Sequence, residues 1–299
     1  MEQIIIKSLD QHKIHLYLWK SVNPKGVIHI FHGMREYALR YKEFAEFLVS
    51  KNYHVVIHDH RGHGKSMIED KTGFFSKDDG WDKLVYDIKI INDYITSELS
   101  GMDIFFLGHS MGSFVLRDAI YSLKDEIKVN GAIISGTGNP SKYLVKIPIL
   151  ITKLLLIFNH PNKPSKLLEK ISFLGYDRHF KNDSVRSWLT RDIDKLNEFK
   201  KYRFAFKEMP IIFYKDLYHG ISRIIREDFF NVKIPLLFVS GREDPVSNFS
   251  KDIEKVTSKY AKYTKVDHHL YNDMRHEVLN EIGREKVYKD IIDWLNHKR

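Results

Sequence analysis

The sequence predicts an α/β protein in which a mostly parallel sheet carries helices on both faces and is interrupted by one helical insertion. Short apolar runs typical of buried strands alternate with longer segments whose apolar residues recur every three or four positions. This alternation stops at residue 137 and resumes at residue 231. We therefore expect a core made of residues 1–136 and 231–299, and a helical cap made of residues 137–230.

The core elements are expected in the order in which the apolar patterns appear. Residues 4–6 and 14–19 flank a polar turn and predict an opening β-hairpin. Further buried strands are expected at residues 27–31, 55–57, 104–107, 132–135, 235–240 and 268–271. Amphipathic helices are expected at residues 41–49, 84–95, 114–120, 249–260 and 286–295. Since ligands of such sheets bind beyond the carboxyl ends of the strands, the loops that follow the strands should carry the chemistry.

The expected cap is rich in leucine and aromatic residues and holds no run typical of a buried strand. Its longest mainly apolar stretch, residues 143–158, is interrupted by two lysines and a proline, and it is too short and too charged to span a bilayer. We expect Leu144, Ile151 and Leu155 on this stretch to line an acyl pocket. The same stretch could rest on a membrane surface, or it could serve only to pack the cap on the core.

Composition excludes several classes of function. With 43% hydrophobic and 13% aromatic residues, the chain can bury a sizeable core. It contains no cysteine, which excludes disulfides and thiolate chemistry. The net charge of +9 favours anionic partners, but the lysines are spread along the chain and no helix-turn-helix or zinc-finger spacing is present. We therefore expect no nucleic-acid partner, and a weak attraction to anionic lipid is the alternative meaning of the charge.

The N-terminal residues 1–8 lack the basic start, the long apolar stretch and the small-residue cleavage site of a signal peptide. We therefore expect a cytoplasmic protein, in which any peripheral membrane contact is made by the cap at the inner face of the membrane. Nothing in the sequence predicts the oligomeric state.

Residues 108–112 have the pattern G-x-S-x-G and lie between an expected strand and an expected helix. In this context the serine, Ser110, sits on a sharp strand-to-helix turn with its oxygen exposed above the sheet. The two glycines are required because a Cβ at either position would collide across so tight a turn. The helix N-terminus behind the serine offers backbone N–H groups to a developing oxyanion. The pattern therefore predicts Ser110 as a catalytic nucleophile.

A serine nucleophile needs a histidine base and a carboxylate, and two later loops supply them. Asp244 follows the strand expected at 235–240, and His276 follows the last strand, just before a helix. The imidazole would take the serine proton, while the carboxylate would hold its tautomer and stabilise the imidazolium. We expect Ser110, Asp244 and His276 to meet at the carboxyl edge of the sheet.

Neighbouring residues offer alternatives for these roles. Glu243 adjoins Asp244 and could exchange roles with it. His109 stands beside the nucleophile, but its side chain should point away from the turn, so packing is its expected role. Other acidic and histidine residues nearby are expected to lie in a strand or in solvated turns: Asp267, His268, His269 and Asp273.

The oxyanion hole would use two backbone N–H groups. One belongs to Met111, the residue after the nucleophile, and the other is expected from Met34, in the loop after the strand at 27–31. The loss of such a donor costs about 3–4 kcal/mol of transition-state stabilisation. Because the donors are backbone groups, the identity of the two side chains matters little to this role.

A metal site is the alternative chemistry that the sequence offers. His58, His60 and His63 nearly form the H-x-H-x-D-H motif of metallo-β-lactamase-type hydrolases, but Gly62 stands where that motif needs an aspartate. The three histidines also lack an obvious fourth ligand. We therefore expect no metal ion.

Together these motifs resemble the monoacylglycerol lipase and lysophospholipase branch of the α/β-hydrolases, which is grouped with serine aminopeptidase-like enzymes. The resemblance covers nearly the whole chain and rests on residues 32–36, 59–66, 107–112, 188–192, 241–246 and 275–281. It implies the α/β-hydrolase fold with a helical cap and no cofactor. It also implies Ser110, Asp244 and His276 as the triad. The oxyanion donors that it implies are Met34 and Met111.

One position departs from the family pattern. The family usually reads H-G-x-G-E near the oxyanion loop, and here Arg35 stands at the second glycine. Its guanidinium is expected to be solvated, or else to bind a phosphate or carboxylate of the substrate. In the second case a lysophospholipid becomes a better substrate than a neutral monoacylglycerol.

The function that these observations favour is hydrolysis of carboxylic esters of single-acyl lipids by a serine enzyme, through an acyl-enzyme. The expected partner is thus a small-molecule lipid or ester. Within this mechanism, lysophospholipids, short soluble esters and peptides are alternative substrates. The alternative classes are a non-catalytic binding protein of the same fold and a metal-dependent hydrolase.

Overall fold

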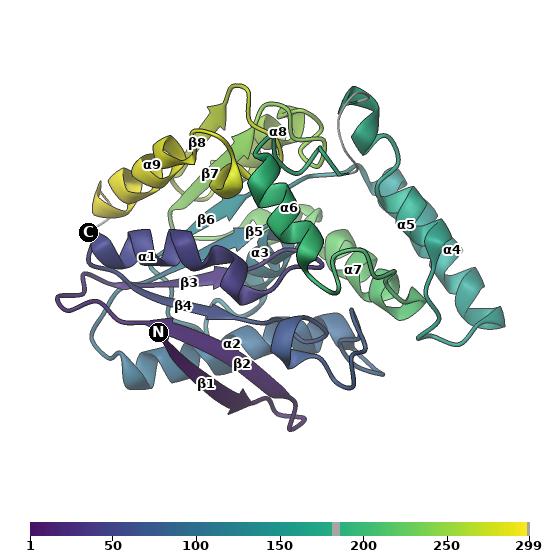
Figure 1. The fold of residues 1–299 in the computed structure, drawn as a ribbon, viewed down its shortest axis with the longest axis horizontal. Coiled ribbons are helices and arrows are strands. Elements are labelled where there is room, and N and C mark those ends of the chain that lie inside the picture. The colour runs from purple at the N-terminus through teal and green to yellow at the C-terminus, as the bar shows by residue number, and fades with distance from the viewer. Residues whose placement is uncertain (181–185, 298–299) are drawn as a thin grey trace.

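A computed structural model describes residues 1–180 and 186–297. Eight strands within these residues form one sheet, with the order β1-β2-β4-β3-β5-β6-β7-β8 (Figure 1). The strands are β1 (Glu2–Lys7), β2 (Lys13–Trp19), β3 (Val27–Phe31), β4 (His54–His58), β5 (Ile104–His109), β6 (Gly131–Ser135), β7 (Leu236–Gly241) and β8 (Val266–Tyr271). β2 pairs with β1 and β4 in antiparallel orientation, whereas all other neighbours are parallel. The predicted α/β architecture is confirmed.

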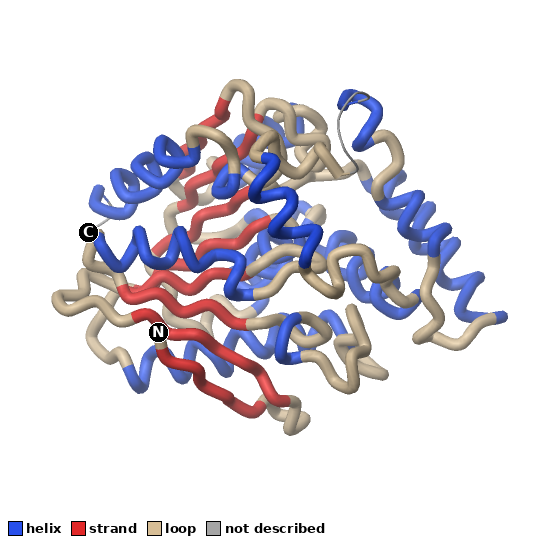
Figure 2. The backbone as a smooth tube through the Cα atoms, in the orientation of Figure 1, coloured by secondary structure: helices blue, strands red, loops and turns tan. Residues whose placement is uncertain are grey.

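Helices cover both faces of the sheet (Figures 1 and 2). The helices of the core are α1 (Lys42–Ser50), α2 (Gly80–Glu98), α3 (Met111–Ser122), α8 (Lys251–Tyr260) and α9 (Arg284–His297). The apolar side chains of α1 and α9 share one buried cluster, and those of α2, α3 and α8 share the other. Each face of the sheet therefore has its own layer of helices.

The alternation of side chains along the central strands explains this burial on two faces. In β5, Phe105 and Leu107 belong to the cluster under α1 and α9, whereas Ile104 and Phe106 belong to the opposite cluster. Successive side chains of a strand point to opposite faces, so a strand covered on both sides must be apolar throughout. This burial on both faces explains why the apolar run just before Ser110 is continuous.

The stretch between β6 and β7, residues 137–230, contains helices and is called the cap below. Its helices are α4 (Lys142–Phe158), α5 (Lys166–Ser172), α6 (Ile193–Lys201) and α7 (Ile211–Ile224). Among its described residues the only strand-like pairing is an isolated bridge between Pro164 and Pro210. α4 and α5 project to one side of the molecule (Figure 1), while the buried side chains of α7 belong to the same cluster as those of α2 and α3.

Short 3₁₀ turns occur at Ala38–Tyr41, Gly64–Ser66, Tyr176–Phe180, Glu227–Phe230 and Val278–Asn280. The elements differ from the sequence expectation mainly at their ends. α2 begins four residues before residue 84, and Trp81, three positions before Leu84, extends the buried face of this helix towards its N-terminus. No helix in the described part of the chain combines the length and the apolar character needed to cross a membrane.

Candidate active site

Ser110 occupies the single residue between β5 and α3. Its φ of 52° and ψ of −122° lie in a region that residues with a side chain rarely adopt. The flanking glycines make this turn possible, since a Cβ on Gly108 would lie 2.6 Å from the carbonyl oxygen of Gly112. A Cβ on Gly112 would in turn clash with the carbonyl oxygen of Phe31, at the end of the neighbouring strand. The turn therefore has the strained geometry that the motif predicts.

His276 and Asp244 form a buried pair in the loops after β8 and β7. The Nδ1 atom of His276 lies 3.0 Å from Oδ1 of Asp244, and both residues are at most 1% exposed. The same carboxylate oxygen accepts the backbone N–H of Val246 at 2.9 Å. Burial lowers the pKa of His276, but the nearby carboxylates of Asp244, Glu277 and Glu36 together outweigh it, so the net pKa lies above the ordinary value. The imidazole is thus held by a carboxylate on its Nδ1 side.

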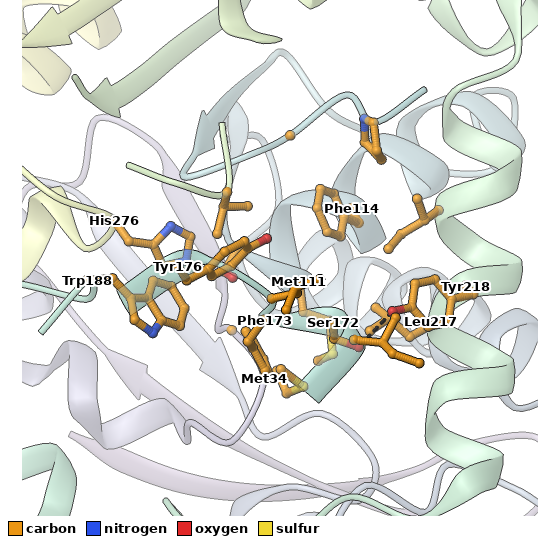
Figure 3. A pocket seen from close by; sticks show the side chains of 18 of the residues that line it. Met34, Met111, Phe114, Ser172, Phe173, Tyr176, Trp188, Leu217, Tyr218 and His276 are labelled. Atoms are coloured by element: carbon orange, nitrogen blue, oxygen red, sulfur yellow. Dashed lines mark hydrogen bonds between the residues drawn. The ribbon is translucent and has the colours of Figure 1, made fainter. Parts of the chain in front are cut away.

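Ser110 and His276 line one cavity of about 480 Å³. In the described residues no hydrogen bond joins these two side chains, and such contacts often tighten only when substrate binds. Figure 3 shows His276 and Trp188 at one end of the cavity and Leu217 and Tyr218, from α7, at the other. The cavity therefore extends from the His276–Asp244 pair into the cap.

The loop after β3 borders the same cavity, and Met34 and Met111 are both among its lining residues. Two bonds fix the peptide groups around Gly33. Its N–H donates to Oε2 of Glu36 at 2.6 Å, and its carbonyl oxygen lies 2.7 Å from Nδ1 of His32. The other ring nitrogen of His32 accepts the backbone N–H of His60 at 3.0 Å, so Nδ1 carries the proton and donates to Gly33. The loop is thereby anchored to the core.

The cap supplies most of the apolar wall, but not through all the residues that the sequence suggests. Leu144 lines the cavity as expected. Ile151 and Leu155 do not, because they lie further along α4 and pack against the main apolar cluster instead. The α4 residues that border the cavity beside Leu144 are Val145, Ile147 and Pro148.

Comparisons with known proteins agree with this geometry. A model of the family described as serine aminopeptidase S33 matches residues 22–283. The chain belongs to the serine aminopeptidase S33 family. This membership confirms the resemblance that the sequence motifs carry, and it makes the chain a hydrolase with the α/β-hydrolase fold.

Similar proteins extend over nearly the whole chain. The phospholipase YtpA of Bacillus subtilis is 26% identical over 281 residues, which cover 92% of this chain and 96% of that protein. The monoacylglycerol lipase of Mycolicibacterium smegmatis is 24% identical, covering 92% and 89%. Among solved structures, a lipase in an open form superposes with a TM-score of 0.90 at 20% identity, covering 99% of this chain and 98% of the other. A monoglyceride lipase from Saccharomyces cerevisiae gives a TM-score of 0.78 at 17% identity, covering 99% and 95%.

In this S33 family member, Arg35 is not solvated as the sequence suggests. It is 1% exposed, and its Nη1 donates to Oε1 of Glu169, on cap helix α5, at 2.8 Å. Arg186 donates to the same carboxylate oxygen at 3.2 Å. Arg35 is not among the residues that line the cavity, whereas Arg186 is. The guanidinium at the position of the family glycine is therefore joined to the cap.

His109 also lies differently from the expectation. Its side chain does not point away from the site, because it lines the cavity with its ring centroid 4.7 Å from that of His276. Burial, and then the neighbouring charge of His276, lower the pKa of His109 to about 4. A neutral imidazole thus packs against the His276 ring.

The other residues that the sequence offered as alternatives to Asp244 and His276 do not line the cavity. Glu243 is 3.6 Å from Nε of Arg275, with its side chain 41% exposed. His268 and His269 are both exposed on the edge strand β8. Asp267 accepts the indole N–H of Trp294 at 2.9 Å, and is thus bound rather than solvated. Asp273 occupies a turn with a φ of 53°.

Two of the three histidines considered for a metal site, His58 and His60, belong to a buried hydrogen-bonded chain that begins at His29. Nε2 of His29 lies 2.9 Å from Nδ1 of His58, and Nε2 of His58 lies 2.8 Å from Nδ1 of His60. His63 instead lies with its Nδ1 3.2 Å from the carbonyl oxygen of Arg61. Burial lowers the pKa of His29 and of His63 to about 3 and keeps those of His58 and His60 well below the ordinary value. The rings of His29, His58 and His60 therefore bond to one another as neutral imidazoles, and His63 is a neutral imidazole outside this chain.

A buried charge cluster beside the cavity was not predicted. Glu36 and Glu277 both line the cavity and both pair with Arg40, which binds Glu277 through two bonds of 2.8 and 2.7 Å. Together with His109, these two carboxylates could hold a metal ion, yet their oxygens already accept the guanidinium. The sequence signal for the cluster is the pair of glutamates that follow His32-Gly33 and His276. It ties the loop after β3 to the loop after β8.

Proposed function

We propose that this hydrolase cleaves carboxylic esters of single-acyl lipids through a triad of Ser110, His276 and Asp244. The observation that carries the proposal is that the candidate catalytic side chains and an apolar wall from the cap meet in one cavity. A strained serine and a histidine held by a buried carboxylate line one cavity, and the cap gives that cavity a mostly apolar wall.

Each residue has a distinct step. The Ser110 oxygen attacks the ester carbonyl carbon while Nε2 of His276 takes its proton, and Asp244 stabilises the resulting imidazolium. The backbone N–H groups of Met34 and Met111 bind the oxyanion. His276 then returns the proton to the leaving alcohol, which leaves an acyl group on Ser110. A water molecule, deprotonated by His276, releases the acid and restores the serine.

The apolar wall supports a substrate with an acyl chain. Phe114 and Leu217 line the cavity beyond the nucleophile, and Val145 and Ile221 add apolar surface from the cap helices α4 and α7. The relatives named monoacylglycerol lipase and phospholipase support the same class of substrate. A chain lying from Ser110 towards Leu217 would place its ester at the nucleophile.

A lysophospholipid is the second candidate substrate, and the guanidinium of Arg186 at the cavity wall favours it. Arg186 lines the cavity and is paired with a carboxylate that Arg35 shares. Glu169 is thus shared by two guanidinium groups, and Asp177 is the other carboxylate near Arg186. A guanidinium at the wall of an acyl cavity suits a phosphate oxygen of a headgroup.

The outer face of α4 supports peripheral contact with a lipid surface. Its exposed apolar residues recur at a spacing of three or four and so share one face of the helix: Tyr143, Ile147, which also borders the cavity mouth, Leu150, Leu154 and Ile157. Lys142, Lys146 and Lys153 on the same helix are exposed and would favour anionic lipid. This contact would place the cap against the membrane from which the substrate comes.

The test is covalent labelling combined with turnover. A fluorophosphonate probe should label the wild-type protein, and Ser110→Ala should abolish labelling and reduce turnover of p-nitrophenyl butyrate by about 10⁴-fold or more. Ser97→Ala, on the exposed side of α2, is the matched control and should keep both the probe labelling and the turnover of the wild-type protein. A folded wild-type protein that the probe does not label would overturn the mechanism. Rates on monoacylglycerols, lysophospholipids and short esters, measured side by side, separate the substrate classes.

A further inference from the structure

The residue next to one proposed oxyanion donor is bound to the cap rather than to the core. Arg35 follows Met34 directly, and its φ of 62° lies in the left-handed region that favours glycine. The conformation that a glycine would adopt without strain is thus kept by a residue with a long charged side chain. A specific contact of that side chain must stabilise it.

The contact is an ion pair with α5. Nη1 of Arg35 lies 2.8 Å from Oε1 of Glu169, and the Arg35 side chain is fully buried while that of Glu169 is 25% exposed. In the described residues this carboxylate is the one hydrogen-bond partner of the guanidinium, because Nε and Nη2 of Arg35 have none. A buried guanidinium that depends on one carboxylate is destabilised strongly when that carboxylate moves away.

The same short helix also forms part of the cavity wall. Ile171, Ser172 and Phe173, at the end of α5, line the cavity together with Met34 (Figure 3). The Ser172 hydroxyl lies 2.7 Å from the Tyr218 hydroxyl on α7, which connects α5 to the part of the cap that packs on the core. Contacts of an acyl chain with Phe173 and Ile171 would therefore stabilise the position of α5 in which Glu169 meets Arg35.

Met34 consequently lies between two anchors. On its N-terminal side the Gly33 peptide is held by His32 and Glu36 of the core. On its C-terminal side Arg35 is held by Glu169 of the cap. We propose that Arg35 is a positioning residue that links the cap to the oxyanion loop, so that the Met34 N–H is aligned while α5 is docked. This proposal rests on the proposed function, since it needs Met34 as an oxyanion donor.

The experiment removes either end of the pair and measures kcat and KM on p-nitrophenyl butyrate, an ester too short to need the acyl wall. Arg35→Met and Glu169→Gln should each lower kcat by about tenfold to a hundredfold and leave KM within about twofold, because the donor is needed in the transition state. The kcat of the double variant should be no more than about twofold below that of the more impaired single variant, because all three variants lose the same interaction. Arg35→Gly, which suits the positive φ, should lose as much as Arg35→Met.

Lys195→Met is the matched control, because Lys195 of α6 also joins the cap to the core, through Glu43 of α1 at 2.7 Å, but touches no part of the oxyanion loop. It should keep kcat within about twofold. The proposal is overturned if kcat stays within twofold in Glu169→Gln, if only KM changes, if the two losses add, or if Arg35→Gly is fully active. Should the Arg35 variants fail to fold, Glu169→Gln decides alone. A wild-type protein that neither turns over the ester nor reacts with the fluorophosphonate contradicts the proposed function instead.

Discussion

The carboxyl edge of the sheet and the cap form opposite walls of one cavity by different means. At the sheet edge, polar side chains are buried and each is bound by named partners: Asp244 by His276, and Glu36 by Gly33 and Arg40. In α4, by contrast, Val145, Pro148 and Thr152 are buried, and most of the other side chains are wholly or partly exposed. The difference shows that hydrogen bonds fix the side chains at the sheet edge, whereas the wall formed by the cap is mainly apolar packing.

The largest expected effect comes from the sheet edge. Asp244→Asn keeps the size of the side chain but no longer stabilises the imidazolium or holds the right tautomer of His276. We expect kcat to fall about 10⁴-fold on both short and long esters. Steady-state kinetics on p-nitrophenyl butyrate and palmitate would measure this. A loss confined to the long ester would contradict the assignment of Asp244 to the chemistry.

Protonation of His276 gives the next effect. The net pKa of His276 lies above 6.5, because the Asp244, Glu277 and Glu36 carboxylates together outweigh the lowering effect of burial. The base must be neutral, so kcat/KM should fall about tenfold per pH unit below that pKa, or about a hundredfold over two units. The pH profile should be the same for short and long esters if the cap carries no essential titrating group. Profiles that differ between the two esters would contradict the view that the essential titrating group lies at the sheet edge and not in the cap.

A change in the cap wall should alter selectivity instead. Leu217→Trp fills the cavity at its α7 end, so we expect kcat/KM for a palmitoyl ester to fall about tenfold while that for a butyryl ester changes less than twofold. Ile193→Trp is the matched control, because Ile193 lies on cap helix α6, is 70% exposed and does not line the cavity. Equal losses on both esters would argue against an acyl chain in this part of the cavity.

The smallest effect is expected on the outer face of the cap. Leu154→Ser removes an apolar side chain that is 50% exposed on α4. Loss of its burial in lipid, about 1 kcal/mol, should weaken partition to anionic vesicles roughly fivefold, while turnover of a soluble ester stays unchanged. Val22→Ser, at a 93% exposed site in the loop between β2 and β3, should leave partition unchanged. Vesicle sedimentation measures both, and equal effects would contradict docking through α4.

The same two regions differ in how well the sequence predicts them. Asp244 and His276 follow apolar runs that can be located without a structure, and parallel strands bring the loops after them to one edge. Their side chains could therefore be expected to meet. The orientation of α4 has no such rule, because its stretch is apolar on several faces, so whether Ile151 or Ile147 meets the cavity depends on tertiary packing.

The sequence also does not predict the ion pairs between residues that are far apart along the chain. Arg40 and Glu277 are 237 positions apart, and Arg35 and Glu169 are 134 apart. No local pattern predicts which of many charged residues are buried together. The sequence also could not predict that His109 lies beside His276. The direction of the His109 side chain depends on the backbone geometry of the strained turn at Ser110.

The buried histidine chain along β3 and β4 implies acid lability. His29, His58 and His60 are neutral in the folded protein, and burial holds their pKa values below the ordinary 6.5. In the unfolded chain the same rings would take up protons near pH 6.5, so unfolding gains roughly 1.4 kcal/mol per group for each pH unit below that value. Their contribution to folding is complete above pH 6.5 and is lost as the medium is acidified. The protein should thus lose stability steeply as the pH falls below about 6.5, which acid denaturation followed by circular dichroism would measure.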